Sequence, residues 1–276
     1  MKLAWTTDIH LDCVDNLLKT VNDLSAASRS AEGIIISGDI SVGDSIVKHL
    51  KLLEDVLQKP IYFVLGNHDY YYSDIVSTRK SVTDACRHMS FCRYLGAISF
   101  AKLDKKNAII GSDGWYDAYN GDPAGTEFLM SDWVKIADFK SAVTNTFFGK
   151  SIDKGKVIKT AREICKASVA HIVRGINACV ESSDHIIVVT HVPPFEESYT
   201  NGKYKDISPK HVVPWYTSKM MGEILKTAAK TYPQKQFTVL SGHTHSSFEG
   251  DILPNLRVKV GKSQYGSPQI VGYIDI

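Results

Sequence analysis

Aspartate, asparagine and histidine recur in five short fragments whose side chains are of the kinds that bind divalent metal ions. In chain order, the fragments are Asp8-Ile9-His10, Gly38-Asp39, Gly66-Asn67-His68-Asp69, His191 and Gly242-His243-Thr244-His245. Each fragment follows an apolar run of the kind that forms a β-strand. Carboxylate, amide and imidazole groups at the ends of neighbouring strands could together hold a pair of metal ions.

The spacing within the fragments predicts how these side chains share the metals. On extended backbone, residues at i and i+2 point the same way, so Asp8 with His10, and His243 with His245, are each expected to face a common centre. The two carboxylate oxygens of Asp39 could bridge two metals. Such a pair, about 3.5–4 Å apart, can activate a bridging water and stabilise the leaving oxygen of a phosphoester.

Phosphoester hydrolysis also needs a proton for the departing alkoxide, and histidine is the usual donor near neutral pH. His68, beside Asn67, is placed for that role, and Asp69 could orient its ring by a hydrogen bond. The mixed nitrogen and oxygen donors suit two divalent metal ions, with Mn or Fe favoured and Zn, Co or Ni as alternatives.

The elements that must position these residues read as an α/β fold with a parallel sheet. Residues 2–65 alternate strand-like and helix-like patterns in the order β-α-β-α-β. Ligands of open α/β sheets bind beyond the carboxyl ends of the strands, where all five fragments fall. We expect later strands at 107–112, 185–190 and 237–241, and an antiparallel finish after residue 248. The chain therefore reads as a single domain, residues 1–276, with an insertion at 113–182.

The insertion is a candidate cap that selects the substrate, because loops on a rigid scaffold often carry specificity. Its first part, residues 113–150, is rich in aromatic side chains, and Trp115 and Tyr116 follow a predicted strand end. Tyr70 follows the third fragment directly and could stack on a base or a phenyl group. His211 lies in a polar loop predicted at 193–214, near where a substrate could enter. Each of these four side chains could instead pack its loop onto the sheet.

Composition limits the class of protein. The chain has 276 residues, 43% of them hydrophobic and 22% charged, which is typical of a soluble globular protein. A net charge of +2 predicts no strong nucleic-acid or membrane partner. No apolar run approaches the ~18–20 residues that span a bilayer, and the first residues do not resemble a signal peptide. Five cysteines without a CxxC pair favour reduced thiols, so we expect a cytoplasmic protein.

The five fragments, in this order, resemble the motifs of the calcineurin-like metallophosphoesterases from residue 5 to about residue 250. The resemblance implies a four-layer α/β/β/α sandwich with a dinuclear metal centre. The combination of Gly-Asn-His-Asp with Gly-His-x-His is most similar to the class III cyclic-nucleotide phosphodiesterases.

Matched motif by motif, the resemblance assigns ligands to two metal ions. It implies that one ion is held by Asp8, His10 and His245. It implies that the other is held by Asn67, His191 and His243. Asp39 would bridge the two ions, and His68 would be the general acid or a phosphate ligand.

The leading hypothesis is a phosphodiesterase that acts on a cyclic or other small nucleotide, with a metal-bridged hydroxide as nucleophile. The alternatives are a phosphomonoesterase acting on a small phosphorylated metabolite and a DNA nuclease. A nuclease would want a broad basic groove, which the sequence does not clearly encode. A hypothesis of a different class is an inactive scaffold on the same fold, which need not hold two metals. The oligomeric state stays open.

Overall fold

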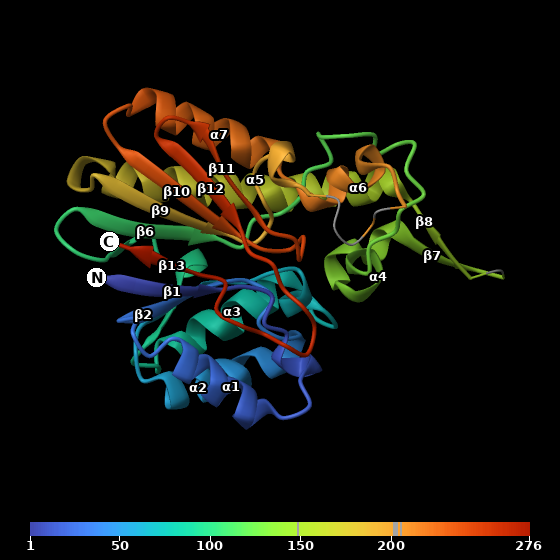
Figure 1. The fold of residues 1–276 in the computed structure, drawn as a ribbon. Coiled ribbons are helices and arrows are strands. Elements are labelled where there is room, and N and C mark those ends of the chain that lie inside the picture. Colours follow the sequence, from blue (N-terminus) through green and yellow to red (C-terminus); the bar gives the residue numbers. More distant parts are fainter. Residues whose placement is uncertain (148, 201–203, 205) are drawn as a thin grey trace.

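The computed structural model describes residues 1–147, 149–200, 204 and 206–276. In these residues, the long strands form two sheets that pack face to face, and helices cover the outer face of each sheet (Figure 1). The layers therefore follow the order α/β/β/α. This arrangement confirms the four-layer sandwich that the resemblance implies.

The first sheet carries three of the five fragments. Its strands lie in the order β13-β1-β2-β3-β4, parallel except for β13, which pairs antiparallel with β1. The bounds are β1 (Lys2–Thr6), β2 (Gly33–Ser37), β3 (Ile61–Val64), β4 (Cys92–Tyr94) and β13 (Gly272–Asp275). β2 and β3 are continuous apolar runs because both of their faces are buried. The carboxyl ends of β1, β2 and β3 meet at one edge, where the first three fragments begin.

The second sheet carries the other two fragments. Its strands lie in the order β11-β12-β10-β9-β6-β5, with β6, β9, β10 and β12 parallel and the two edge strands antiparallel. The bounds are β5 (Ala101–Lys102), β6 (Asn107–Ser112), β9 (His185–Thr190), β10 (Gln236–Ser241), β11 (Phe248–Leu253) and β12 (Leu256–Val260). The predicted antiparallel finish is therefore only partly right, because β12 runs parallel to β10.

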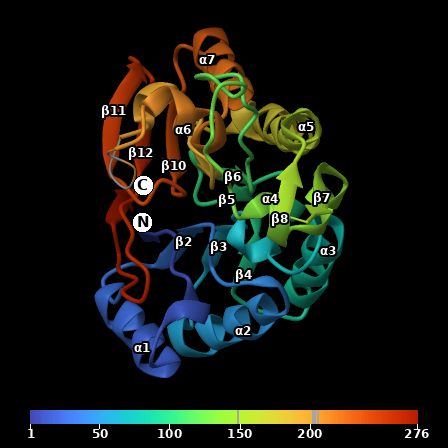
Figure 2. The same cartoon turned by 90° about the vertical axis from the view of Figure 1, so that its right-hand side faces the viewer.

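The outer layers are amphipathic helices, and all of them except α2 begin at a side-chain cap. α1 (Leu17–Ala27), α2 (Ile46–Leu57) and α3 (Ile75–Cys86) cover the first sheet, and α5 (Lys154–Cys179) and α7 (Lys219–Thr231) cover the second (Figures 1 and 2). Each capping side chain accepts a hydrogen bond from a backbone N–H of the first turn, which is why these helices start where they do. The capping residues are Asn16, Asp74, Asp153 and Ser218.

Buried apolar side chains join the layers. The cluster between the two sheets includes Trp5, Val64, Ile109, Val189 and Leu240. Separate clusters lie beneath the helices on each outer face. The two sheets are thus packed together with their strand ends at a common edge, where one site can draw side chains from both.

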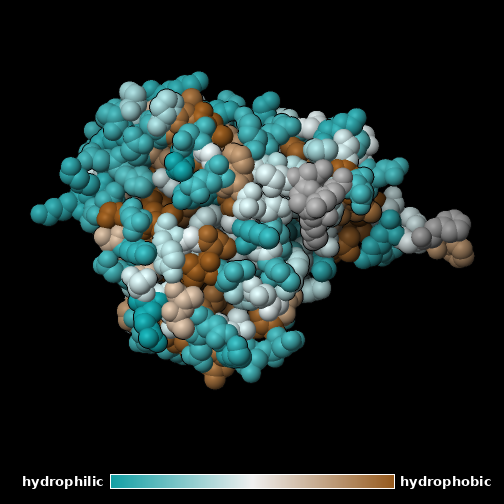
Figure 3. Space-filling model, viewed as in Figure 1, coloured by the Kyte–Doolittle hydropathy of each residue, from teal (hydrophilic) through white to brown (hydrophobic). Residues whose placement is uncertain are grey.

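The range predicted as an insertion divides into two parts. Helix α5 belongs to the sandwich, because Gly175 packs closely against Ile110 of β6. Residues 113–153, apart from residue 148, hold α4 (Asp132–Lys135) and the hairpin β7 (Val143–Thr146) and β8 (Gly149–Ile152). This part projects beyond the strand ends together with α6 (Pro209–Tyr216) (Figures 1 and 2). Figure 3 shows the hairpin extending from the body of the molecule, whose visible face mixes hydrophilic and hydrophobic side chains.

The segment around α6 differs from the prediction. A loop was expected at 193–214, but α6 occupies its last part and continues to Tyr216. Residues 201–203 and 205 lie outside the described residues. Helix α7 then begins at Lys219, after Thr217 and Ser218 separate it from α6. Among the described residues, no helix combines the length and the apolar character needed to cross a bilayer. All five cysteines carry free thiols.

Candidate metal centre and substrate cavity

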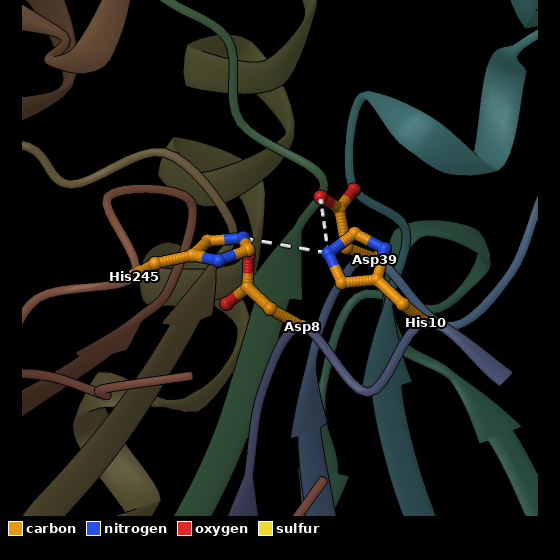
Figure 4. A group of neighbouring side chains, drawn as sticks. All are labelled: Asp8, His10, Asp39 and His245. Atoms are coloured by element: carbon orange, nitrogen blue, oxygen red, sulfur yellow. Dashed lines mark hydrogen bonds and ion pairs between the residues drawn. The ribbon is translucent and has the colours of Figure 1, made fainter. Parts of the chain in front are cut away.

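Four of the predicted ligands converge at the edge where the sheets meet. The donor atoms of Asp8, His10, Asp39 and His245 all lie within 4.8 Å of one another (Figure 4). Nε2 of His245 is 3.2 Å from Oδ1 of Asp8 and 3.4 Å from Nε2 of His10. Donors bound about 2.1 Å from one ion lie roughly 3 Å apart, so these side chains fit a shared metal ion.

A second group lies on the other side of Asp39. Nε2 of His191 is 3.3 Å from Oδ1 of Asp39 and 3.0 Å from Oδ1 of Asn67. The ring of His243 lies 5.1 Å from that of His191, measured between centroids. In the first group, Oδ2 of Asp39 is 3.7 Å from Nε2 of His10. Asp39 therefore presents one oxygen to each group, as a bridging carboxylate would.

Hydrogen bonds to backbone carbonyls orient two of these imidazoles. Nδ1 of His191 lies 2.9 Å from the carbonyl oxygen of Ser37, and Nε2 of His243 lies 3.1 Å from that of Trp215. A carbonyl only accepts, so these nitrogens carry the protons. The other ring nitrogens, Nε2 of His191 and Nδ1 of His243, are therefore the ones that can bind a metal ion, which at Nε2 of His191 would replace a proton.

The backbone at the site is strained. Five of the predicted ligands have left-handed φ angles between 39° and 68°, which non-glycine residues rarely adopt. They are Asp8, His10, Asp39, His243 and His245. The expectation of extended backbone at the i and i+2 pairs is therefore wrong, and the side chains converge because tight loops turn them inward. Strain of this kind clusters at functional sites.

The glycines of the fragments leave room for the ligands. A Cβ atom on Gly66 would overlap the carboxylate of Asp39 and the ring of His191. Gly38 has φ of 96°, and a Cβ there would also overlap the ring of His191. Gly66 is therefore required for close approach, and Gly38 for both close approach and backbone conformation.

Burial and neighbouring charges shift the pKa values in opposite directions. Burial alone would raise the pKa of Asp8, but the hydrogen bond and charge of His245 hold it at about 2. Burial would lower the pKa of His191, but the charge of Asp39 raises it to about 10. For His68 and His243, burial dominates and lowers the pKa to about 4 and about 3, respectively. The centre is a closely coupled set of charges, which divalent cations would neutralise.

Asp69 does not orient His68, contrary to the prediction. Its carboxylate accepts hydrogen bonds from the backbone N–H groups of Ile40, Ser41 and Gly66, at 2.7–2.9 Å. These groups belong to the loops that follow β2 and β3. Asp69 therefore ties the two loops together, and the ring of His68 instead stacks beside Tyr71, with centroids 4.3 Å apart.

A cavity of about 130 Å³ opens at the metal centre. His68 lines it with its side chain 22% exposed, and Nε2 of His68 is 4.0 Å from Oδ2 of Asp39. Much of the remaining wall is aromatic. The aromatic residues of the wall are Tyr71, Phe128, Tyr204, Tyr216 and Tyr265.

The structure corrects three of the four residues predicted to contact substrate. Tyr70, Trp115 and Tyr116 are at most 1% exposed and do not line the cavity. Tyr70 donates a hydrogen bond to Asp113 behind the site, while Trp115 and Tyr116 pack in an aromatic core. His211 lines a neighbouring cavity of about 480 Å³ that shares Phe128 with the first.

Most of the aromatic wall was not predicted from the sequence. Tyr216 stacks on His243 with centroids 4.6 Å apart, and Tyr265 lies 4.4 Å from the ring of His10 and 4.9 Å from that of His245. Neither belongs to a metal-binding fragment, so nothing local distinguished them. For Tyr71, the run of three tyrosines after Asp69 was a usable signal, but it did not say which tyrosine faces the site.

Comparisons with known proteins agree with this geometry. Residues 1–247 match the family model of the calcineurin-like phosphoesterases. No curated protein matches the sequence. The fold is similar to that of phosphopantetheinyl hydrolase PptH from Mycobacterium tuberculosis, with a TM-score of 0.62 and 17% identity over 96% of this chain and 90% of that chain. It is also similar to a dimetal phosphatase from Danio rerio, with a TM-score of 0.58 and 10% identity over 98% and 88% of the two chains. At these identities, the two structures support the fold alone.

Proposed function

This chain belongs to the calcineurin-like phosphoesterase family, and on that premise we propose that it hydrolyses a phosphodiester with a planar aromatic group, at a centre of two divalent metal ions. The observation that carries the proposal is the position of His68. It lies at the cavity wall, beside both groups of predicted ligands. A phosphoryl group in the cavity would therefore meet the metal centre and His68 together.

Two groups of side chains would hold the metal ions. The ligands of the first ion would be Asp8, His10 and His245, and those of the second Asn67, His191 and His243, with Asp39 between them. When bound, the metal ions supply Lewis acidity and an activated water. The protein's own part is to fix the ligand geometry, which the strained loops and the contacts to Ser37 and Trp215 do.

His68 would bind a phosphoryl oxygen. Burial holds its pKa at about 4, so the imidazole is neutral near pH 7 and can donate a hydrogen bond through one ring N–H. A neutral imidazole is a poor proton donor. Of the two roles that the resemblance implies, this pKa favours the phosphate ligand over the general acid.

The wall of the cavity suggests the chemical class of the ester. Tyr71, Tyr216 and Tyr265 lie within stacking distance of imidazoles of the site. Aromatic walls suit a planar ring such as a nucleobase. Among the described residues that line the cavity, none is a lysine or an arginine. That supports a phosphodiester, with a single negative charge, over a doubly charged monoester. A cavity of about 130 Å³ also suits a small ester better than a DNA duplex.

The test compares three p-nitrophenyl esters with Mn²⁺ present: the thymidine 5′-diester, the methyl diester and the unsubstituted monoester. All three release the same leaving group, so differences report recognition of the rest of the substrate. We expect kcat/KM to be highest for the thymidine diester, by roughly tenfold or more over the methyl diester, which is the scale of one base stacking on an aromatic ring. Highest kcat/KM for the monoester would overturn the diester assignment in favour of a phosphomonoesterase.

A further inference from the structure

We infer that Asp132, in the projecting segment 113–153, is a positioning residue for Asn67 and thereby sets the affinity for one of the two metal ions. The inference rests on the proposed function, because it takes Asn67 as a metal ligand. Asp132 lies outside the five fragments and at the start of the short helix α4. Its side chain is fully buried.

Asn67 needs a partner that distinguishes the two ends of its amide. Its Oδ1 can bind a metal ion, whereas its Nδ2 only donates hydrogen bonds. Nδ2 donates to Oδ1 of Asp132 at 2.8 Å, and Oδ1 of Asn67 lies 3.0 Å from Nε2 of His191. An amide turned the other way would set its oxygen against the carboxylate of Asp132, with no hydrogen between the two acceptors. A carboxylate can only accept, so Asp132 selects the orientation that points Oδ1 toward His191.

Tyr71 strengthens the same arrangement. Its hydroxyl donates to Oδ1 of Asp132 at 2.9 Å and lies 3.5 Å from Nδ2 of Asn67. Tyr71 also lines the cavity and packs beside His68. Oδ1 of Asp132 therefore accepts hydrogen bonds from both Asn67 and Tyr71, which belong to the turn after β3.

The segment that carries Asp132 is fixed to that turn by its backbone. The N–H of Tyr72 donates to the carbonyl of Lys135 at 2.8 Å, and the N–H of Ala137 donates to the carbonyl of Ser73 at 2.9 Å. α4 thus has a set register against the turn that contains Asn67. A rigid support of this kind is what a group that orients a metal ligand requires.

A purely structural role for Asp132 makes a different prediction. Asp138 provides the comparison, because it lies in the same segment and its carboxylate accepts from the backbone N–H of Ile75 at 3.0 Å, without touching the site. If Asp132 only fixed the segment, Asp132→Leu and Asp138→Asn would have the same effect on metal binding. If Asp132 orients Asn67, only the change at residue 132 weakens one metal site.

The experiment titrates metal-free protein with Mn²⁺ by isothermal calorimetry. We expect two sites in the unchanged protein and in Asp138→Asn. In Asp132→Leu, which removes the acceptor at similar volume, one site should weaken by about 10–100-fold while the other stays unchanged. Asp132→Asn keeps an oxygen acceptor without the charge, so the affinity of the same site for Mn²⁺ should fall only about fivefold. Turnover of Asp132→Leu should recover when Mn²⁺ is raised to saturate the weak site, which a misfolded protein would not do.

If each of the two Mn²⁺ ions binds with the same affinity to the unchanged protein, to Asp132→Leu and to Asp132→Asn, the inference is overturned. The proposed function would be left intact. If Asp132→Leu does not fold, as judged by circular dichroism, the Mn²⁺ affinities of Asp132→Asn alone test the inference. Fewer than two Mn²⁺ ions in the unchanged protein would overturn the proposed dinuclear centre itself.

Discussion

The Nε2 atoms of His10 and His245 lie 3.4 Å apart, although 235 positions separate the two residues in the chain. His10 follows β1 of the first sheet, and His245 follows β10 of the second. The two imidazoles therefore meet across the junction of the sheets. A metal ion held by both would link the two halves of the sandwich.

Removing metal should consequently destabilise the whole fold. A ligand present at 100 times its Kd stabilises the native state by about 2.7 kcal/mol. For a chain of this size, that corresponds to a fall of roughly 5–10 °C in melting temperature when EDTA is added. Adding Mn²⁺ back should restore the loss, and Asp39→Asn should gain less from Mn²⁺ than the unchanged protein. Identical melting curves with and without EDTA would show that no metal joins the sheets.

Gly66→Ala should abolish most activity because its Cβ would displace Asp39 and His191. A shift of about 1 Å in catalytic groups can cost roughly 100-fold in turnover. Gly155→Ala is the matched control, since it lies in α5, where the nearest atom to a new Cβ is 3.3 Å away and alanine favours the helix. Steady-state kcat on bis-p-nitrophenyl phosphate would compare the two variants, and near-normal turnover of Gly66→Ala would refute the close packing.

The His68→Ala substitution separates phosphate binding from proton donation. Loss of one hydrogen-bond donor to the reacting phosphoryl group should lower kcat by roughly 100-fold. If His68 binds the phosphoryl group, the loss in kcat should be similar for a p-nitrophenyl diester and for a phenyl diester, whose leaving group is the stronger base. A much larger loss on the phenyl ester would instead mean that His68 protonates the leaving group.

The metal-free protein should become less stable as the pH falls from about 6.5 toward 4. Burial holds the pKa of His68 at about 4 and that of His243 at about 3, below the value of about 6.5 expected when unfolded. The unfolded chain therefore binds protons first, and the stability present above pH 6.5 is lost in this window. His191, with its pKa raised to about 10, opposes this slope near pH 6.5, and its effect fades at lower pH as the unfolded chain also becomes protonated there.

Urea unfolding in EDTA at pH 7, 6 and 5 would measure this slope. His243→Asn removes one of the depressed groups, so its free energy of unfolding should depend less steeply on pH. Equal slopes for His243→Asn and the unchanged protein would contradict the assignment.

The strand ends were predictable because the buried parallel strands are continuous apolar runs with a polar fragment after each. Asp39 and His191 could be placed at one edge for that reason alone. The backbone that presents the ligands was not predictable in the same way. Left-handed φ angles at Asp8 and His10 depend on contacts between loops, such as the N–H of Asp8 bonded to the carbonyl of Gly38.

The residues that form the wall of the cavity could not be predicted from local sequence pattern. Tyr216 and Tyr265 reach the site through the packing of α6 and of the segment before β13, and neither stands near a predicted ligand in the chain. Trp115 and Tyr116 were wrongly predicted to contact substrate, because an aromatic residue after a strand end can pack in a core as readily as it can line a pocket. No local sequence feature pointed to Asp132, since its role depends on the approach of α4 to Asn67.

The most direct test of a dinuclear phosphodiesterase is turnover of bis-p-nitrophenyl phosphate as metal-free protein is titrated with Mn²⁺, with bound metal counted in the same samples. Because the two predicted ligand groups share Asp39, hydrolysis should appear only as the second ion binds, and Asp39→Asn should stay inactive at every metal ratio. Full turnover with one ion per chain, or with none, would contradict the account.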